Sequence, residues 1–231
     1  MIKAFLTDLD NTLVDFMRMK KMAVEMACNY MINVGLDVPF QEMYDEVFRV
    51  YWSTNIESQS ALEQSLINKI GKIDKKILSS GIIGYQRGRD MATYTYPHVE
   101  STIRDILRMG LKIGVISDAP AEQAYNRLSR LHLTPWLDIV VTFDDTGERK
   151  PSTKPFLFAL EKLNLKPQEV VYCGDWPERD IPGAKSIGMV TVFARWGEHS
   201  DAPPTGADYD LKDISEIVDV IKKLNGVSKN Y

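Results

Sequence analysis

The sequence predicts an α/β protein with a doubly wound parallel sheet and an inserted helical domain. From Pro97 onward, short apolar runs alternate with amphipathic helical patterns. These runs are apolar throughout, as in strands that helices cover on both faces. Residues 16–94 show helical periodicity without a convincing strand. We therefore expect a core domain built from residues 1–15 and 95–231, interrupted by a helical domain at 16–94.

The chain begins with a buried strand, since Ile2–Leu6 is an apolar run too short for a helix. Apolar residues then recur at intervals of three and four, and Gly35 and Gly71 follow two of these runs as helix-ending residues. The helices expected in the inserted domain cover residues 19–34, 40–51, 62–70 and about 74–85.

The remainder of the chain supplies the other strands of the expected sheet and the helices that cover it. The expected strands are 111–116, 139–143, 170–173 and 189–194, and the expected helices are 99–108, 121–131, 155–163, 181–186 and 214–224. A loop is expected at 202–206, which contains two prolines and a glycine. Ligands bind such sheets at the carboxyl ends of the strands, so we expect the functional residues there.

Composition limits the classes of function. The 231 residues are 44% hydrophobic, which suits a filled core, and carry a formal net charge of −4. This charge does not favour nucleic acid as a partner, and no apolar run approaches the ~20 residues that span a bilayer. The first strand leaves no room for a signal peptide, so we expect a cytoplasmic protein, as a monomer or a homodimer. Cys28 and Cys173 are expected to be buried free thiols.

Acidic residues follow the first strand. If the strand continues through Asp8 and Asp10, both side chains point to the same side, roughly 6–7 Å apart. Two carboxylates this close repel each other and favour a bound cation, and their oxygen ligands suit Mg²⁺. The alternative is an acidic surface turn, in which Asp10, Asn11 and Thr12 supply turn and cap hydrogen bonds.

Three later segments place polar groups near predicted strand ends. Ser117 ends one strand, where its hydroxyl can hold a phosphate oxygen or cap the next helix. Lys150 brings a compact positive charge just before a helix, although most loop lysines are simply solvated. Asp175 follows a buried strand and a glycine, and Asp180 lies five residues later, where it can also act as a helix cap.

Together these segments resemble the four motifs of the haloacid dehalogenase superfamily of phosphohydrolases. The matching residues, in order, are Asp8, Asp10 and Thr12, then Ser117, then Lys150 with Pro151, then Gly174 and Asp175 with Asp180. The resemblance covers the whole chain. It implies a Rossmann-like core with an all-helical cap domain of the C1 type. The dehalogenases of this superfamily have an uncharged residue in place of Asp10, so Asp10 points to phosphate chemistry.

The resemblance also implies roles for these residues. Asp8 is the nucleophile that forms a phospho-aspartyl intermediate, Asp10 is the general acid and base, and Lys150 neutralises negative charge. Asp8, the backbone carbonyl of Asp10 and Asp175 hold Mg²⁺, while Asp180 orients Lys150 or a metal-bound water. The expected phosphate-binding residues are Thr12, Ser117, Asp118 and Lys150.

We therefore expect a Mg²⁺-dependent phosphatase that hydrolyses phosphomonoesters of small metabolites. A phosphosugar mutase on the same core and a non-catalytic protein that binds a metabolite or a partner are the alternatives. Arg18, Trp176 and Arg195 lie near the expected edges of the site and are candidate substrate contacts. The three histidines, His98, His132 and His199, receive no role.

Overall fold

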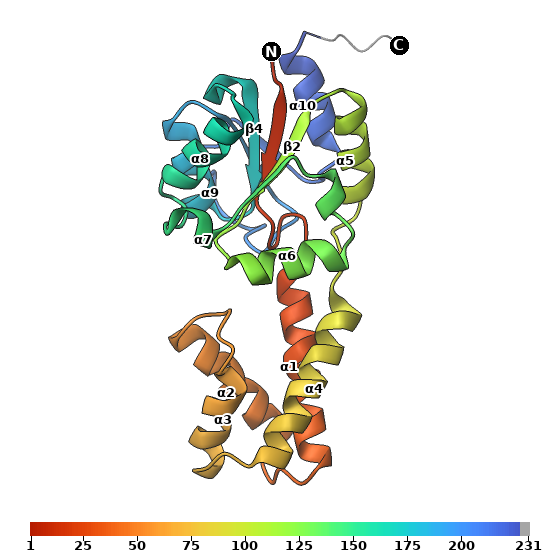
Figure 1. The fold of residues 1–231 in the computed structure, drawn as a ribbon, viewed down its shortest axis with the longest axis vertical. Coiled ribbons are helices and arrows are strands. Elements are labelled where there is room, and N and C mark those ends of the chain that lie inside the picture. The colour runs from red at the N-terminus through yellow and green to blue at the C-terminus, as the bar shows by residue number, and fades with distance from the viewer. Residues whose placement is uncertain (227–231) are drawn as a thin grey trace. The chain divides into compact units, whose positions relative to one another are not determined.

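The structure is a computed structural model, which describes residues 1–226. It divides into two compact units (Figure 1). One unit consists of Met1–Asp15 together with Tyr94–Tyr231, and the other of Phe16–Thr93. No helix among the described residues is both long and apolar enough to cross a membrane.

The first unit, which we call the core unit, contains a six-stranded parallel sheet in the order β3-β2-β1-β4-β5-β6. The strands are β1 (Ala4–Thr7), β2 (Lys112–Ile116), β3 (Ile139–Val141), β4 (Val170–Gly174), β5 (Val190–Ala194) and β6 (Tyr209–Leu211). The chain runs outward from β1 through β2 to β3, and then returns to the other side of β1 to form β4, β5 and β6. Sheets of this kind bind ligands where the strand order reverses, which in this chain is at the carboxyl ends of β1 and β4. The prediction of a doubly wound α/β fold is confirmed.

Helices cover both faces of this sheet (Figure 1). The helices of the core unit are α5 (Val99–Arg108), α6 (Ala121–Arg130), α7 (Phe143–Thr146), α8 (Lys154–Leu163), α9 (Pro177–Ser186) and α10 (Glu216–Leu224), with short 3-10 helices at Thr134–Trp136 and Pro167–Glu169. Because side chains alternate along a strand, neighbouring residues of β1 enter different clusters. Phe5 packs with residues of α5 and α10, whereas Leu6 packs with residues of α8 and α9.

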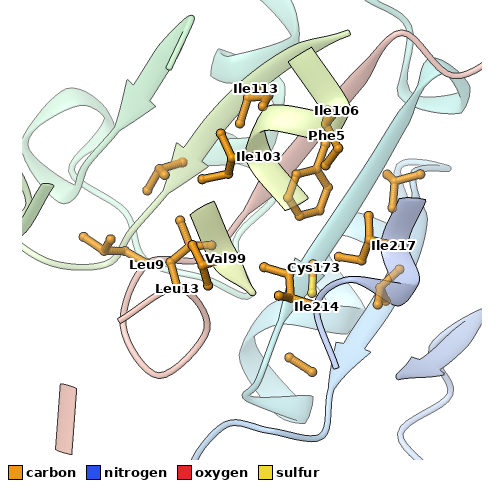
Figure 2. Close-up of a cluster of buried hydrophobic side chains, with 14 of the residues drawn as sticks. Phe5, Leu9, Leu13, Val99, Ile103, Ile106, Ile113, Cys173, Ile214 and Ile217 are labelled. Atoms are coloured by element: carbon orange, nitrogen blue, oxygen red, sulfur yellow. The ribbon is translucent and has the colours of Figure 1, made fainter. Parts of the chain in front are cut away.

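Figure 2 shows the cluster on the α5 and α10 face, which extends beyond the strand ends. Leu9 and Leu13, from the loop that follows β1, are fully buried in it beside Val99 of α5. Cys173 of β4 belongs to the same cluster, and both cysteines are buried free thiols, as predicted. The loop after β1 is thus held in place by apolar packing on both sides of Asp10.

The second unit, which we call the helical unit, consists of α1 (Phe16–Asn33), α2 (Phe40–Ser53), α3 (Ala61–Ile70) and α4 (Lys75–Ala92). It has its own apolar cluster, which includes Met31, Met43 and Leu66. Helices α1 and α4 approach closely at Gly84, where an added Cβ atom would lie 2.5 Å from the carbonyl oxygen of Met26. No strand occurs among residues 16–93.

Several elements differ from those expected. Helix α4 continues to Ala92, and α9 begins at Pro177, four residues earlier than the apolar pattern indicated. Strand β3 ends at Val141, and residues expected at its end start the short helix α7. Strand β6 was missed, because its three residues Tyr209–Leu211 are too few for a period to be visible.

Candidate active site

The candidate site lies at the carboxyl ends of the central strands. Asp8 directly follows β1, Ser117 follows β2, and Asp175 follows β4. Parallel strands present their carboxyl ends at one edge, which brings residues more than a hundred positions apart in the chain to the same place. All three residues are buried.

The reason given from the sequence for pairing Asp8 with Asp10 was wrong. Strand β1 ends at Thr7, so the two aspartates do not share the face of a strand. The chain turns instead, with Asn11 in the left-handed region at φ 58° and the N–H groups of Leu13 and Val14 donating to the carbonyl of Leu9. The turn allows the two carboxylates to meet different partners.

Three carboxylates gather at the strand ends. Oxygen atoms of Asp8, Asp175 and Asp180 all lie within 4.8 Å of one another. Asp180 comes from the first turn of α9, and its carboxylate accepts a hydrogen bond from the N–H of Trp176 at 2.9 Å. Gly174 makes room for it, because a Cβ atom at Gly174 would lie only 2.2 Å from Cγ of Asp180.

Lys150 enters this cluster from the loop before α8. Its Nζ lies 2.6 Å from Oδ1 of Asp8 and 2.8 Å from Oδ1 of Asp180, and it donates to the hydroxyl of Tyr172 at 3.2 Å. The side chain is 3% exposed, so solvent screens these charges little. The structure therefore brings together the first, third and fourth sequence segments around one ammonium group.

The acidic groups of the cluster outnumber its one basic group. Burial, together with the nearby Asp180 and Asp175, raises the pKa of Asp8 well above its usual range, although Lys150 opposes this shift. Burial and Asp180 also raise the pKa of Asp175 to about 7. Burial by itself would lower the pKa of Lys150, but the carboxylates of Asp180, Asp8 and Asp118 raise it. One lysine thus faces three acids, and the excess of oxygen ligands fits a hard cation.

Asp10 has a different cation. Nη1 of Arg127, on α6, donates to Oδ2 of Asp10 at 2.8 Å, and both side chains are largely buried. The three-carboxylate cluster does not include the side chain of Asp10, and the assignment of its backbone carbonyl as a metal ligand stays a prediction. Arg127 was not identified from the sequence, in which it is one of many arginines at helical spacing.

The residues expected to bind phosphate are distributed around this centre. Thr12 donates its hydroxyl to Oδ1 of Asp175 at 3.3 Å, and Oδ1 of Asp118 accepts the backbone N–H of Lys150 at 2.9 Å. The hydroxyl oxygen of Ser117 accepts the N–H of Ala119 at 3.2 Å. Thr12 and Asp118 thus contact residues of the cluster, and their assignment to phosphate binding stays a prediction.

Two further features were missed. Tyr172, on β4, donates its hydroxyl to Oδ1 of Asp180 at 2.7 Å, but the sequence shows it only as one apolar residue of a strand. The loop after β5 also reaches the site, since the N–H of Glu198 donates to Asp175 at 3.0 Å and Trp196 donates to the carbonyl of Thr12 at 2.9 Å. A Trp-Gly pair after a strand was the only local signal.

Of the three residues considered as substrate contacts, Arg18 lies on α1 in the helical unit, whereas Trp176 and Arg195 have other partners in the core unit. The ring of Trp176 lies 4.6 Å from the ring of His199 and stacks against the guanidinium of Arg179 at 4.1 Å. Arg195 pairs with Asp210 near the end of the sheet. Their roles toward a substrate stay predictions.

Comparison with known proteins shows which proteins this chain resembles in sequence and in fold. Residues 5–194 match the family described as haloacid dehalogenase-like hydrolase. A glyceraldehyde 3-phosphate phosphatase of Methanocaldococcus jannaschii is 33% identical over 97% of this chain and 99% of its own length, and one of Methanopyrus kandleri is 31% identical over 97% and 99%. A putative β-phosphoglucomutase from Thermotoga maritima has the same fold, with a TM-score of 0.74, 20% identity and coverage of 96% and 99%.

The raised pKa of Asp175 predicts how the thermal stability of the protein depends on pH. Folding raises this pKa from 3.8 to about 7 and so favours the protonated form. The stabilising contribution of that form is complete below about pH 4 and is lost as the pH rises to about 7, by roughly 1.4 kcal/mol per pH unit. We expect the melting temperature of the wild type, measured with a chelator, to fall relative to that of Asp175→Asn across this window.

Thermal unfolding of both proteins at several pH values measures this difference. Groups that titrate equally in the two proteins cancel, and Asp105→Asn, an exposed change on α5, should follow the wild type. If the curves of the wild type and Asp175→Asn run parallel from pH 4 to 8, Asp175 does not experience the charge imbalance.

Proposed function

This chain belongs to the haloacid dehalogenase-like hydrolases, and we propose that it hydrolyses small phosphomonoesters with Mg²⁺ through a covalent phosphoryl group on Asp8. The phosphatase class predicted from the sequence is confirmed by the two phosphatases that match nearly the whole chain. The nucleophile, the metal and the substrate class are parts of the proposal.

The observation that carries the proposal is the contact between Lys150 Nζ and Asp8 Oδ1, at 2.6 Å inside the three-carboxylate cluster. A carboxylate repels a phosphate dianion unless positive charge lies beside both. Lys150 supplies that charge where the phosphoryl group would arrive, and its raised pKa keeps it protonated. It thereby favours the ionised form of Asp8, which the attack on phosphorus requires.

The metal site proposed for Mg²⁺ consists of the carboxylates of Asp8 and Asp175 with the backbone carbonyl of Asp10. These ligands are all oxygen, as Mg²⁺ prefers, and the cluster holds more negative charge than Lys150 can balance. When bound, the ion would neutralise charge on the phosphoryl oxygens. Asp180 stays outside the proposed set, because Lys150, Tyr172 and the N–H of Trp176 already occupy its oxygens.

The proton transfers are assigned to Asp10. Its carboxyl group would protonate the oxygen of the leaving alcohol, and its carboxylate would later accept a proton from the water that attacks the phosphoryl group on Asp8. Ser117 would donate a hydrogen bond to a phosphoryl oxygen. Its oxygen accepts the N–H of Ala119, and no described residue accepts its hydroxyl proton.

The substrate is proposed to be a small phosphorylated metabolite, with glyceraldehyde 3-phosphate as the first candidate because of the named relatives. The helical unit is proposed to act as the cap domain. It is inserted directly after the loop that carries Asp8, and the two connections are tied together where the N–H of Asp15 donates to the carbonyl of Tyr94 at 3.2 Å. A tethered lid limits the size of the substrate.

We expect Asp8→Asn to abolish phosphatase activity, because a neutral amide cannot serve as the anionic nucleophile. Activity of the wild type should disappear with a chelator and return with Mg²⁺. Release of inorganic phosphate from glyceraldehyde 3-phosphate and from a generic aryl phosphate measures both effects. Asp105→Asn, which changes an exposed side chain on α5, should remain active. Retention of even a tenth of the wild-type rate by Asp8→Asn would rule out covalent catalysis by Asp8.

We also expect small phosphate esters to be better substrates than phosphopeptides, because a loop of another protein would hold a lid open. The comparison is of kcat/KM for triose, sugar and carboxylic acid phosphates against a set of phosphopeptides. The best small ester should exceed every peptide by at least roughly tenfold. A phosphopeptide that equals it would show that the helical unit does not exclude large substrates.

A further inference from the structure

Arg127 occupies an unusual position on the buried face of α6. It lies on the same face of the helix as Ala124 and Leu128, whose side chains are fully buried. Its own side chain is 6% exposed. Helices normally place apolar residues at such positions, since burying a guanidinium is costly unless a carboxylate compensates it. Asp10 provides that carboxylate, at 2.8 Å from Nη1.

Helix α6, which carries Arg127, is fixed by contacts at its start and along its buried face. It starts just after the loop of Ser117, and the N–H of Ala121 in its first turn donates to Asp144 of α7 at 2.9 Å. Ala124 and Leu128 anchor its buried face in the same apolar cluster as Leu9 and Leu13, the residues on either side of Asp10. The helix and the loop that Arg127 joins therefore share one packed core.

The two acids of the first motif thus have separate cations. Lys150 contacts Asp8, and Arg127 contacts Asp10. The proposed reaction requires different behaviour of the two, because Asp8 forms a bond to phosphorus while Asp10 exchanges protons. Arg127 Nη1 donates to Oδ2 of Asp10, and a planar guanidinium fixes the direction of such a hydrogen bond more strictly than the rotating ammonium of a lysine does.

We propose that Arg127 is a positioning residue, which holds the carboxyl group of Asp10 where it exchanges protons with the leaving group and with water. This inference rests on the proposed function and adds to it a residue that no motif contains. In the first step a carboxylate oxygen of Asp8 bonds to phosphorus as the P–O bond to the leaving alcohol breaks, and the oxygen of the alcohol takes the proton of Asp10. In the second, water loses a proton to Asp10 as its oxygen bonds to phosphorus and the bond to Asp8 breaks.

Substrates whose leaving groups differ in their need for a proton distinguish this positioning role of Arg127 from a merely structural one. An alkoxide needs a proton to depart, whereas p-nitrophenolate leaves without one. The ratio kcat/KM covers only the steps up to the transfer of the phosphoryl group to Asp8. If the carboxyl group of Asp10 is no longer held in place, kcat/KM should therefore fall far more for an alkyl phosphate than for p-nitrophenyl phosphate.

The experiment compares Arg127→Met, Arg127→Lys and the wild type with glycerol 3-phosphate, as the alkyl phosphate, and p-nitrophenyl phosphate. For Arg127→Met we expect kcat/KM to fall roughly 30-fold or more with the alkyl ester and less than about threefold with the aryl ester. Arg127→Lys should show the same bias to a smaller degree, because it keeps the charge but not the planar guanidinium that directs the hydrogen bond. Arg104→Met, which removes an exposed arginine from α5, should show no bias.

Melting temperatures identify variants that fail to fold. If Arg127→Met does not fold, the two esters are compared with Arg127→Lys instead. Equal losses with both esters in a folded variant would make Arg127 merely structural and overturn the inference. So would unchanged kinetics with both esters. A wild type that hydrolyses neither ester, nor any other phosphomonoester, would instead overturn the proposed function, and the two failures are therefore distinguishable.

Discussion

Three buried carboxylates share one lysine at the carboxyl end of the central strands, and the local structure is arranged around this shortage of positive charge. Lys150 lies within 2.8 Å of both Asp8 and Asp180, and Tyr172 and the N–H of Trp176 satisfy further oxygens of Asp180. Such a cluster would be costly in an ordinary core. In the proposed function a bound cation offsets the excess negative charge of the cluster and, together with Lys150, offers positive charge to a phosphate dianion.

The fold supplies the proximity that the cluster needs. The strand order reverses beside β1, so the loops after β1 and β4 begin at neighbouring strand ends. The loop after β1 is anchored by buried leucines, and the loop after β5 donates the N–H of Glu198 to Asp175. Packed and hydrogen-bonded elements therefore hold the acids in place, as the proposed electrostatic catalysis requires.

The sequence predicted the parts of this account that depend on local patterns. Strands and helices repeat with clear periods, and Asp8, Lys150, Asp175 and Asp180 stand in recognisable order near strand ends. The contacts of Arg127 and Tyr172 could not be predicted, because each depends on which helix or strand face lies opposite in the folded chain. The strand argument for Asp8 and Asp10 was wrong for the same reason, since tertiary packing of the leucines turned the chain after Thr7.

The proposed mechanism depends on transfer of the phosphoryl group to Asp8. It is tested most directly by mixing the enzyme with substrate and Mg²⁺, quenching in acid, reducing with borohydride and mapping the peptides by mass spectrometry. Reduction converts a phosphorylated aspartate to homoserine and leaves a free carboxylate unchanged. The account predicts homoserine at position 8, dependent on substrate. An unmodified Asp8 in an enzyme trapped during turnover, or reduction at another acid, would contradict it.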